Sequence, residues 1–209
     1  MTEYSGVVIG YVRGELVYGK FMESVIAEKD RSGAAVMGQE SEPFVDNARN
    51  ILIDRFMATD KEWFLSVDTD IVLPDHVVTR LLARRLPLVG ALINVNTNPP
   101  SPQVYQRMRV YEKLSEGLPW GSSTFLIDKE WEPGELVKAD ATGAGCLLVH
   151  RDVFEAIPGK PPARWFQHEF RSTIWFGEDM VFFERAAAAG YQLYIDTAVK
   201  AGHLKTRAI

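Results

Sequence analysis

The feature of this sequence that most constrains its fold is an apolar run, residues 63–67, that ends abruptly in Asp68 and Asp70. The run reads Trp-Phe-Leu-Ser-Val, and its aromatic and β-branched side chains predict a buried strand. Because alternate residues of an extended chain point the same way, both carboxylates can face one ligand. Hard oxygen ligands at a strand end suit Mg²⁺ or Mn²⁺ carrying a phosphate. The spacing alone fits at least as well a strand-to-loop turn in which one aspartate caps the next helix.

Composition limits the class of protein. The chain has 209 residues, enough for one domain, and 46% of them are hydrophobic. Its net charge of −5 argues against nucleic-acid binding by counterion release. A single cysteine, Cys146, excludes an internal disulfide and fits a reducing compartment. The start of the chain has no secretory pattern, and no apolar run approaches the ~18 residues of a membrane span, so we expect a soluble, cytoplasmic protein.

The first half of the chain alternates between strand and helix patterns. Apolar runs predict strands over residues 6–12, 34–37, 63–67 and 88–93. Apolar residues at helical spacing predict helices over residues 16–28, 43–56 and 74–86. This alternation is typical of crossover units and a mainly parallel sheet. Ligands of such sheets bind beyond the carboxyl ends of the strands, which is where Asp68 and Asp70 lie.

The second half is less regular. Residues 94–138 are rich in proline and asparagine, and we expect irregular structure there with short antiparallel strands near 103–107 and 125–128. Order resumes at a glycine turn, residues 142–145, that runs into a strand. The remaining predicted elements are a short helix over 152–156, a helix over 178–189 closed by Gly190, and a last strand over 191–195.

The order of these parts resembles the GT-A-fold glycosyltransferases, especially the small family-2-like enzymes of bacteria and phages. The shared motifs are Asp-x-Asp at 68–70, the glycine turn at 142–145, Gly-Glu-Asp at 177–179 and a late His203. Each motif alone is weak, but their order over residues 6–203 is fairly specific. The resemblance implies an α/β, Rossmann-like GT-A fold: a mostly parallel central sheet, helices on both faces and a small antiparallel acceptor-side region. It also implies a single catalytic domain over 1–209, with a nucleotide-binding half (1–93) and an acceptor-side half (94–209) carrying the catalytic acids.

The resemblance further implies a metal-dependent donor site for a nucleotide-sugar, with UDP- and GDP-sugars both possible. Asp70 would ligate Mn²⁺ or Mg²⁺ bridging the diphosphate, Asp68 would contact the ribose or the metal as well, and His203 would join the metal shell. A nucleoside diphosphate leaves poorly until its developing charge is neutralised. The other expected donor-binding residues are Gly10, Tyr11, Arg13, Arg49, Gly143 and Gly145. Roles without a ligand remain open for these residues. His203 could belong to the C-terminal tail, Arg49 could lie on a solvated helix face, and Gly143 and Gly145 could form a plain turn.

Two further groups concern catalysis and the acceptor. By resemblance Asp179, or else Glu178, is the base that takes the proton of the acceptor hydroxyl. Acidic residues also simply complement the dipole at a helix start. Sugars stack on aromatic rings, so Trp175 and Trp165, just before the acidic pair, are candidates for an acceptor-side wall. The alternative for both tryptophans is a small satellite core beneath a loop.

We therefore expect a glycosyltransferase that moves one sugar to a protein or glycan hydroxyl, in the host cytoplasm if the chain is phage-encoded. Processive relatives carry Gln-x-x-Arg-Trp after the base, and that motif is absent here. One alternative is a nucleotidyltransferase acting on a sugar phosphate, although the glycine-rich loop expected after the first strand is poor. Another is a non-catalytic nucleotide- or sugar-binding domain. Stereochemical outcome and oligomeric state are not readable from the sequence.

Overall fold

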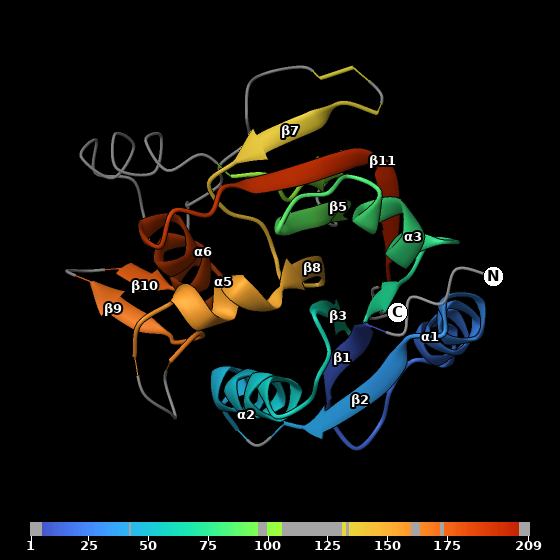
Figure 1. Ribbon diagram of the computed structural model, residues 1–209, viewed down its shortest axis with the longest axis horizontal. Helices are drawn as coiled ribbons and strands as arrows, with labels where there is room; N and C mark the ends of the chain where they lie inside the picture. The colour runs from blue at the N-terminus through green and yellow to red at the C-terminus, as the bar shows by residue number, and fades with distance from the viewer. Residues whose placement is uncertain are drawn as a thin grey trace, which may run out of the picture.

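A nine-stranded sheet forms the centre of the molecule, and helices cover both of its faces (Figure 1). The structure is a computed structural model. It describes residues 6–41, 43–95, 100–105, 131–132, 134–159, 164–171 and 174–204. The predicted strand at 125–128, and residues 106 and 107 of the one at 103–107, lie outside the described residues. Within 103–107, Tyr105 forms an isolated antiparallel bridge with Ala141.

The sheet is mostly parallel, as predicted. Its main path runs β2-β1-β3-β8-β5-β11-β4. Five strands share one direction: β1 (Val7–Arg13), β2 (Ala35–Glu40), β3 (Trp63–Asp68), β5 (Leu88–Val95) and β11 (Leu193–His203). The antiparallel strands are β4 (Ile71–Val72), β6 (Ser101–Pro102), β7 (Leu136–Ala139) and β8 (Cys146–His150). A separate antiparallel hairpin consists of β9 (Glu169–Arg171) and β10 (Ile174–Phe176).

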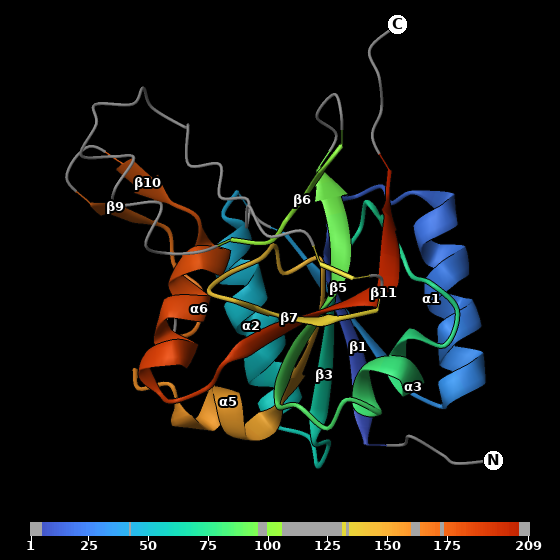
Figure 2. The ribbon, with the colours of Figure 1, turned by 90° about the horizontal axis from the view of Figure 1, so that it is seen from above.

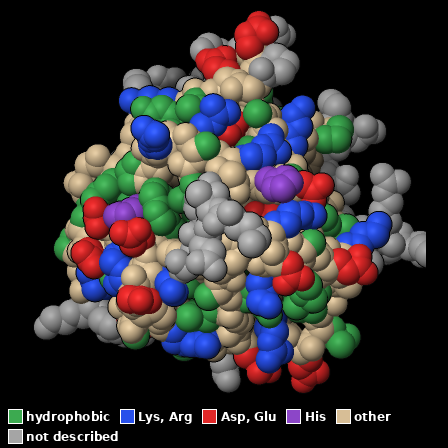
Figure 3. Space-filling model, turned by 45° about the vertical axis from the view of Figure 1, so that its right-hand side comes forward, with side chains coloured by type: hydrophobic (Ala, Val, Ile, Leu, Met, Phe, Trp, Pro, Cys, Tyr) green, Lys and Arg blue, Asp and Glu red, His purple; other side chains and the backbone are tan. Residues whose placement is uncertain are grey.

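The helices divide between the two faces of the sheet (Figure 2). On one face lie α1 (Gly19–Ser32) and α3 (Val77–Leu82). On the other lie α2 (Val45–Met57), α5 (Arg151–Ala156) and α6 (Glu178–Ala188). None of the helices in the described part of the chain combines the length and apolar character that crossing a bilayer requires. On the face shown in Figure 3, acidic and basic side chains are interspersed.

The alternation of side chains along the strands builds two separate cores. In β1, Val7 and Ile9 pack toward α1 and α3, whereas Val8 between them packs toward α2. In β3 the same rule sends Leu65 to the first core and Phe64 to the second. Each fully buried aliphatic or aromatic side chain contributes about 1.5–3 kcal/mol. The strands are therefore apolar on both faces, which explains their near-continuous hydrophobic runs.

Several helices and strands begin or end at residues other than those predicted. Helix α1 begins at Gly19 rather than residue 16, and Leu16 is 90% exposed in the preceding loop. Helix α3 covers only six residues of the predicted 74–86. The last strand runs on from the predicted 191–195 as far as His203. It passes from pairing with β7 to pairing with β4, and a register shift against β5 lies between Asp196 and Lys200.

Candidate active site

The Asp-x-Asp motif lies at the carboxyl end of β3, as predicted. Strand β8 pairs antiparallel with β3, and the backbone N–H of Asp68 donates to the carbonyl of Gly145 over 3.1 Å. This pairing brings the glycine turn beside the motif. A Cβ atom on Gly145 would come within 3.0 Å of Asp68 Oδ2, so the missing side chain makes room for the carboxylate. At Gly143 a Cβ would lie 2.8 Å from Gln103 Oε1, so an added side chain would require the flexible Gln103 side chain to move.

Arg49 links the Asp-x-Asp motif to the acidic pair. It lies on α2 but is only 7% exposed, so it does not lie on a solvated helix face. Its Nη2 donates to Asp68 Oδ1 over 2.7 Å and its Nη1 to Ser66 Oγ over 3.4 Å. Its Nε lies 3.4 Å from Glu178 Oε1 but is buried without a hydrogen bond. Burial opposes the cation, yet the charges of Asp68, Asp179 and Glu178 outweigh it and raise the pKa of Arg49.

The next residue along the helix, Asn50, anchors a distant segment. Its Nδ2 donates to the carbonyl of Phe166 over 2.7 Å, and its Oδ1 accepts from the N–H groups of Trp165 and Phe166, each over 3.1 Å. Asn50 is buried, so these bonds are shielded from water. Thus one turn of α2 holds both Asp68 and the chain that leads to the acidic pair.

Glu178 and Asp179 begin α6, as predicted, directly after Gly177. Glu178 is 8% exposed and Asp179 is half-buried. Asp179 Oδ2 accepts from the N–H of Ala144, in the glycine turn, over 3.3 Å. Burial, together with the charge and a hydrogen bond of Glu178, raises the pKa of Asp179 to about 6, against the opposing effects of Arg49 and Ala144. A carboxylate with a pKa near neutrality is suited to general-base chemistry.

Asp70 and His203 meet at the end of β11. His203 Nε2 lies 3.1 Å from Asp70 Oδ2, and the N–H of Leu204 donates to the carbonyl of Asp70 over 2.7 Å. His203 Nδ1 lies 3.0 Å from the carbonyl oxygen of Asn94. His203 is thus part of a paired strand and not of a loose tail. Asp68 does not complete a set with them: no three His, Cys, Asp or Glu residues in the described ranges are grouped so as to hold a metal.

The residues expected at the end of β1 have other roles. A Cβ on Gly10 would lie 2.1 Å from Phe64 Cζ, so packing of the Phe64 ring, not approach of a ligand, requires glycine there. Tyr11 packs edge-on against Phe21, with ring centroids 5.2 Å apart. Arg13 Nη2 lies 3.6 Å from Glu40 Oε2, and the Arg13 side chain is 40% exposed. Tyr11 and Arg13 are both partly exposed, whereas Gly10 is buried.

The two candidate acceptor tryptophans differ in exposure to solvent. Trp165 is 1% exposed, and its indole N–H donates to the carbonyl of Phe154 over 2.9 Å. It therefore belongs to the core, and its expected place on an acceptor wall is wrong. Trp175 is 60% exposed on β10 and pairs across the hairpin with Phe170, which is 55% exposed. Their ring centroids are 5.3 Å apart, so they form an exposed aromatic pair close in sequence to Asp179.

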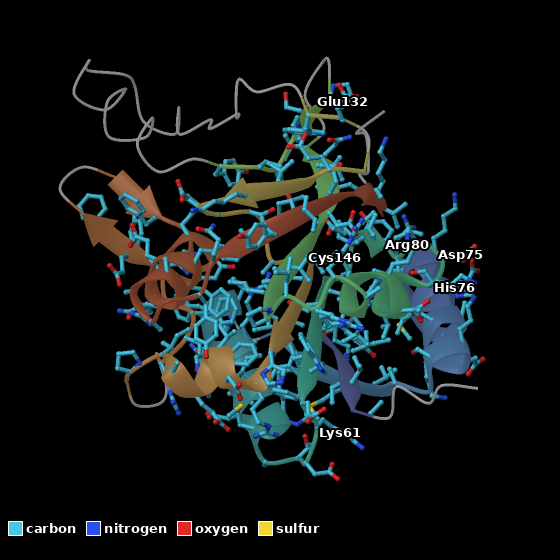
Figure 4. All side chains as sticks on the ribbon, turned by 45° about the horizontal axis from the view of Figure 1, so that its top comes forward. Lys61, Asp75, His76, Arg80, Glu132 and Cys146 are labelled. Atoms are coloured by element: carbon cyan, nitrogen blue, oxygen red, sulfur yellow. The ribbon has the colours of Figure 1, made fainter. Side chains whose placement is uncertain are left out.

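Two residues near the site, His168 and Asp46, were missed by the sequence analysis. His168 Nε2 lies 3.0 Å from Glu178 Oε2, and His168 Nδ1 lies 3.3 Å from Asp46 Oδ2. The only sequence signal is a histidine within the aromatic run before Gly-Glu-Asp, and no spacing rule selects it. Cys146, by contrast, is no candidate nucleophile: it lies in the sheet (Figure 4), and burial raises the pKa of its thiol to about 12.

Comparison with known proteins bears on the fold. No protein-family model and no curated protein sequence matches the chain. Among solved structures, A197 from STIV matches with a TM-score of 0.65 and 17% identity, over 96% of this chain and 86% of that one. GalNAc-T7, in a structure with UDP, GalNAc and Mn²⁺, matches with a TM-score of 0.61 and 15% identity, over 95% of this chain.

The chain has a GT-A-like glycosyltransferase fold. At these identities the likeness establishes the GT-A-like architecture and not an activity. The chain spans 44% of the length of GalNAc-T7, so the activity of that larger protein does not transfer with the fold.

Proposed function

We propose that the chain is a metal-dependent glycosyltransferase that moves one sugar from a nucleotide-sugar to the hydroxyl of a protein or glycan acceptor. The observation that carries this proposal is the network Asp68–Arg49–Glu178, which joins the expected donor motif to the expected catalytic acids. The raised pKa of the neighbouring Asp179 supports a catalytic role for it.

The atoms around His203 fit a divalent cation. Both ring nitrogens face oxygen atoms, Nδ1 the carbonyl of Asn94 and Nε2 the carboxylate of Asp70. A neutral imidazole carries one N–H, so with Nδ1 donating, Nε2 presents a lone pair to a carboxylate. A divalent cation held by Nε2 and Asp70 would remove that repulsion, as a proton on Nε2 also would, and the bond to Asn94 would fix the orientation of the ring. Imidazole with carboxylate favours Mn²⁺ among the candidates, and Mg²⁺ remains possible.

In this proposal Asp70 and His203 would hold the metal beside the diphosphate of a UDP- or GDP-sugar. When bound, the metal neutralises the negative charge that develops on the departing nucleoside diphosphate. Arg49, one of the expected donor-binding residues, keeps Asp68 fixed at the end of β3. Asp68 is then oriented toward the nucleotide rather than being a principal metal ligand.

Asp179 acts as the base. Its ionised carboxylate takes the proton of the acceptor hydroxyl as that oxygen bonds to the anomeric carbon and the bond to the diphosphate oxygen breaks. The N–H of Ala144 holds one carboxylate oxygen in place. The exposed rings of Trp175 and Phe170 offer a stacking surface for a sugar of the acceptor.

The test is product formation. The purified chain is incubated with UDP- and GDP-sugars, Mn²⁺ or Mg²⁺, and a panel of peptide and glycan acceptors, and products are identified by mass spectrometry. The proposal predicts nucleoside diphosphate together with an acceptor heavier by one sugar. Turnover of a nucleoside triphosphate and sugar phosphate to pyrophosphate would instead identify a nucleotidyltransferase. Donor binding without any turnover would identify a binding domain.

A further inference from the structure

His168 lies between two carboxylates that come from different helices. Asp46 of α2 lies 3.3 Å from its Nδ1, and Glu178 of α6 lies 3.0 Å from its Nε2. The backbone N–H of His168 also donates to Asp46 Oδ2 over 3.2 Å. Burial disfavours the ionised form of Asp46, but the contacts with His168 and Asn47 outweigh it and lower the pKa of Asp46. Asp46 is therefore an anion that holds both the backbone and the ring of His168.

Each ring nitrogen of His168 faces a carboxylate oxygen. A neutral imidazole has one N–H and can donate to only one of the two carboxylates, whereas the imidazolium donates to both. The described cations of this region are Arg49, which contacts Glu178 and Asp68, and Arg185, which contacts Glu169. Because the side chain of His168 is 39% exposed, water can supply the proton.

The segment that carries His168 is built to hold it there. Asn50 bonds the backbone of Trp165 and Phe166, and the Phe166 ring stacks on Phe182 with centroids 4.7 Å apart and an interplanar angle of 11°. On both sides of His168, Arg185 of α6 bonds the neighbouring side chains: Nη2 donates to Gln167 over 2.7 Å and to Glu169 over 3.3 Å.

We propose that His168 is a positioning residue that, as an imidazolium, fixes the Glu178 carboxylate between itself and Arg49 and so leaves Asp179 as the carboxylate that takes the acceptor proton. Both oxygens of Glu178 are engaged, Oε2 by His168 and Oε1 by the charge of Arg49. Asp179 Oδ2 accepts from the backbone N–H of Ala144, and Asp179 also shares a hydrogen bond with Glu178. His168, which contacts Glu178, thus determines the different roles of Glu178 and Asp179. The role of Asp179 as the base for an acceptor hydroxyl rests on the proposed function. The predicted difference in protonation between Glu178 and Asp179 does not.

The first experiment is a carboxyl ¹³C NMR titration of the full chain labelled at aspartate, with Asp179 assigned from Asp179→Asn. In the wild type Asp179 should titrate near pH 6. In His168→Gln the loss of a cation beside Glu178 lets Glu178 share a proton with Asp179, and the midpoint of Asp179 should rise by about 0.5 pH unit or more. His150→Gln is the matched control, because His150 pairs with Asp152 on α5. An unchanged Asp179 midpoint in folded His168→Gln would overturn the proposal.

The second experiment needs no variant of His168. Imidazole ¹⁵N NMR of the wild type at pH 7 is tractable because the chain has four histidines. His168 should show both nitrogens protonated, and Glu178→Gln should remove that signature. A single neutral tautomer of His168 in the wild type would contradict the proposal even if His168→Gln failed to fold. Neither experiment requires turnover. If the chain transfers no sugar, the proposed function is wrong, but the two NMR results still decide whether His168 holds Glu178. If transfer is found, His168→Gln should lower kcat and move its acidic limb upward with the KM for the donor unchanged.

Discussion

His203 Nε2 lies 3.1 Å from Asp70 Oδ2, although the two residues are 133 positions apart in the chain. The antiparallel pairing of β11 with β4, in which His203 faces Ile71, brings them together. This junction closes the same edge of the sheet at which β3 delivers Asp68. The candidate donor site is therefore a consequence of topology, since its parts come from segments far apart in the sequence.

Asp179→Asn should leave donor binding intact and reduce transfer by about 10²–10⁴-fold, because the amide cannot take a proton. Steady-state kinetics combined with calorimetric titration of the donor nucleotide would separate the two effects. Asp54→Asn, on an exposed position of α2, is the control. Full activity in Asp179→Asn would show that another group is the base.

The raised pKa of Asp179 also predicts how stability depends on pH. A carboxyl whose pKa is about 6 in the folded state and 3.8 in the unfolded chain binds its proton more tightly when folded. Its favourable contribution is present below pH 3.8 and is lost as pH rises through about 6. At pH 7, Asp179→Asn should therefore be more stable than the wild type by on the order of 2 kcal/mol, and the difference should shrink between pH 6 and 4. Urea unfolding across this range measures it, and a destabilised variant at pH 7 would be the contrary result.

The sequence could predict those site residues whose role shows in the residues next to them in the chain. It could not predict those whose role depends on a contact with a distant residue. Asp68 and Asp70 end an apolar run, and the Glu178–Asp179 pair opens a periodic helix, so both were found from neighbouring residues. His168 was missed because its significance lies in Asp46, which comes from another helix. The orientation of β8 was equally hidden, because a strand pattern does not state its direction. Gly10 was expected near a ligand because of its position at the end of the first strand, and the packing of the Phe64 ring, which accounts for the glycine, could not be seen from the sequence.

Arg49→Lys should destabilise the protein although it conserves charge. An ammonium cannot replace the guanidinium fork that reaches Asp68, Ser66 and the vicinity of Glu178 at once. We expect a loss of at least about 1 kcal/mol in the free energy of unfolding, with complete removal of the charge in Arg49→Ala costing about 3–5 kcal/mol. Arg55→Lys is the matched control on the same helix, because Arg55 bonds Gly38 and Gln39 at an exposed position. Equal stability of the two lysine variants would count against the buried network.

Gly10→Ala should destabilise the fold by about 1–3 kcal/mol through overpacking, since the new Cβ would lie 2.1 Å from Phe64 Cζ. Phe64→Leu should partly rescue the double variant, which a donor-binding role for Gly10 would not predict. At Gly19, where a Cβ meets nothing within 4 Å, alanine should be tolerated or stabilising. Thermal unfolding of the four variants decides the matter, and a Gly10→Ala protein with normal stability but lost donor binding would restore the ligand role.

The most direct test of the proposed function is the thermal stability of the wild type, Asp70→Ala and Asp75→Ala with UDP, GDP and their sugars, each with and without Mn²⁺. Asp75 is the control because it is an exposed aspartate paired with Arg31. Ligand at a hundred times its Kd stabilises the folded state by about 2.7 kcal/mol. We predict a rise in Tm with one nucleotide that requires Mn²⁺, is lost in Asp70→Ala and persists in Asp75→Ala. No rise with any nucleoside diphosphate, or a rise that Asp70→Ala leaves unchanged, would contradict a metal-dependent donor site at Asp70 and His203.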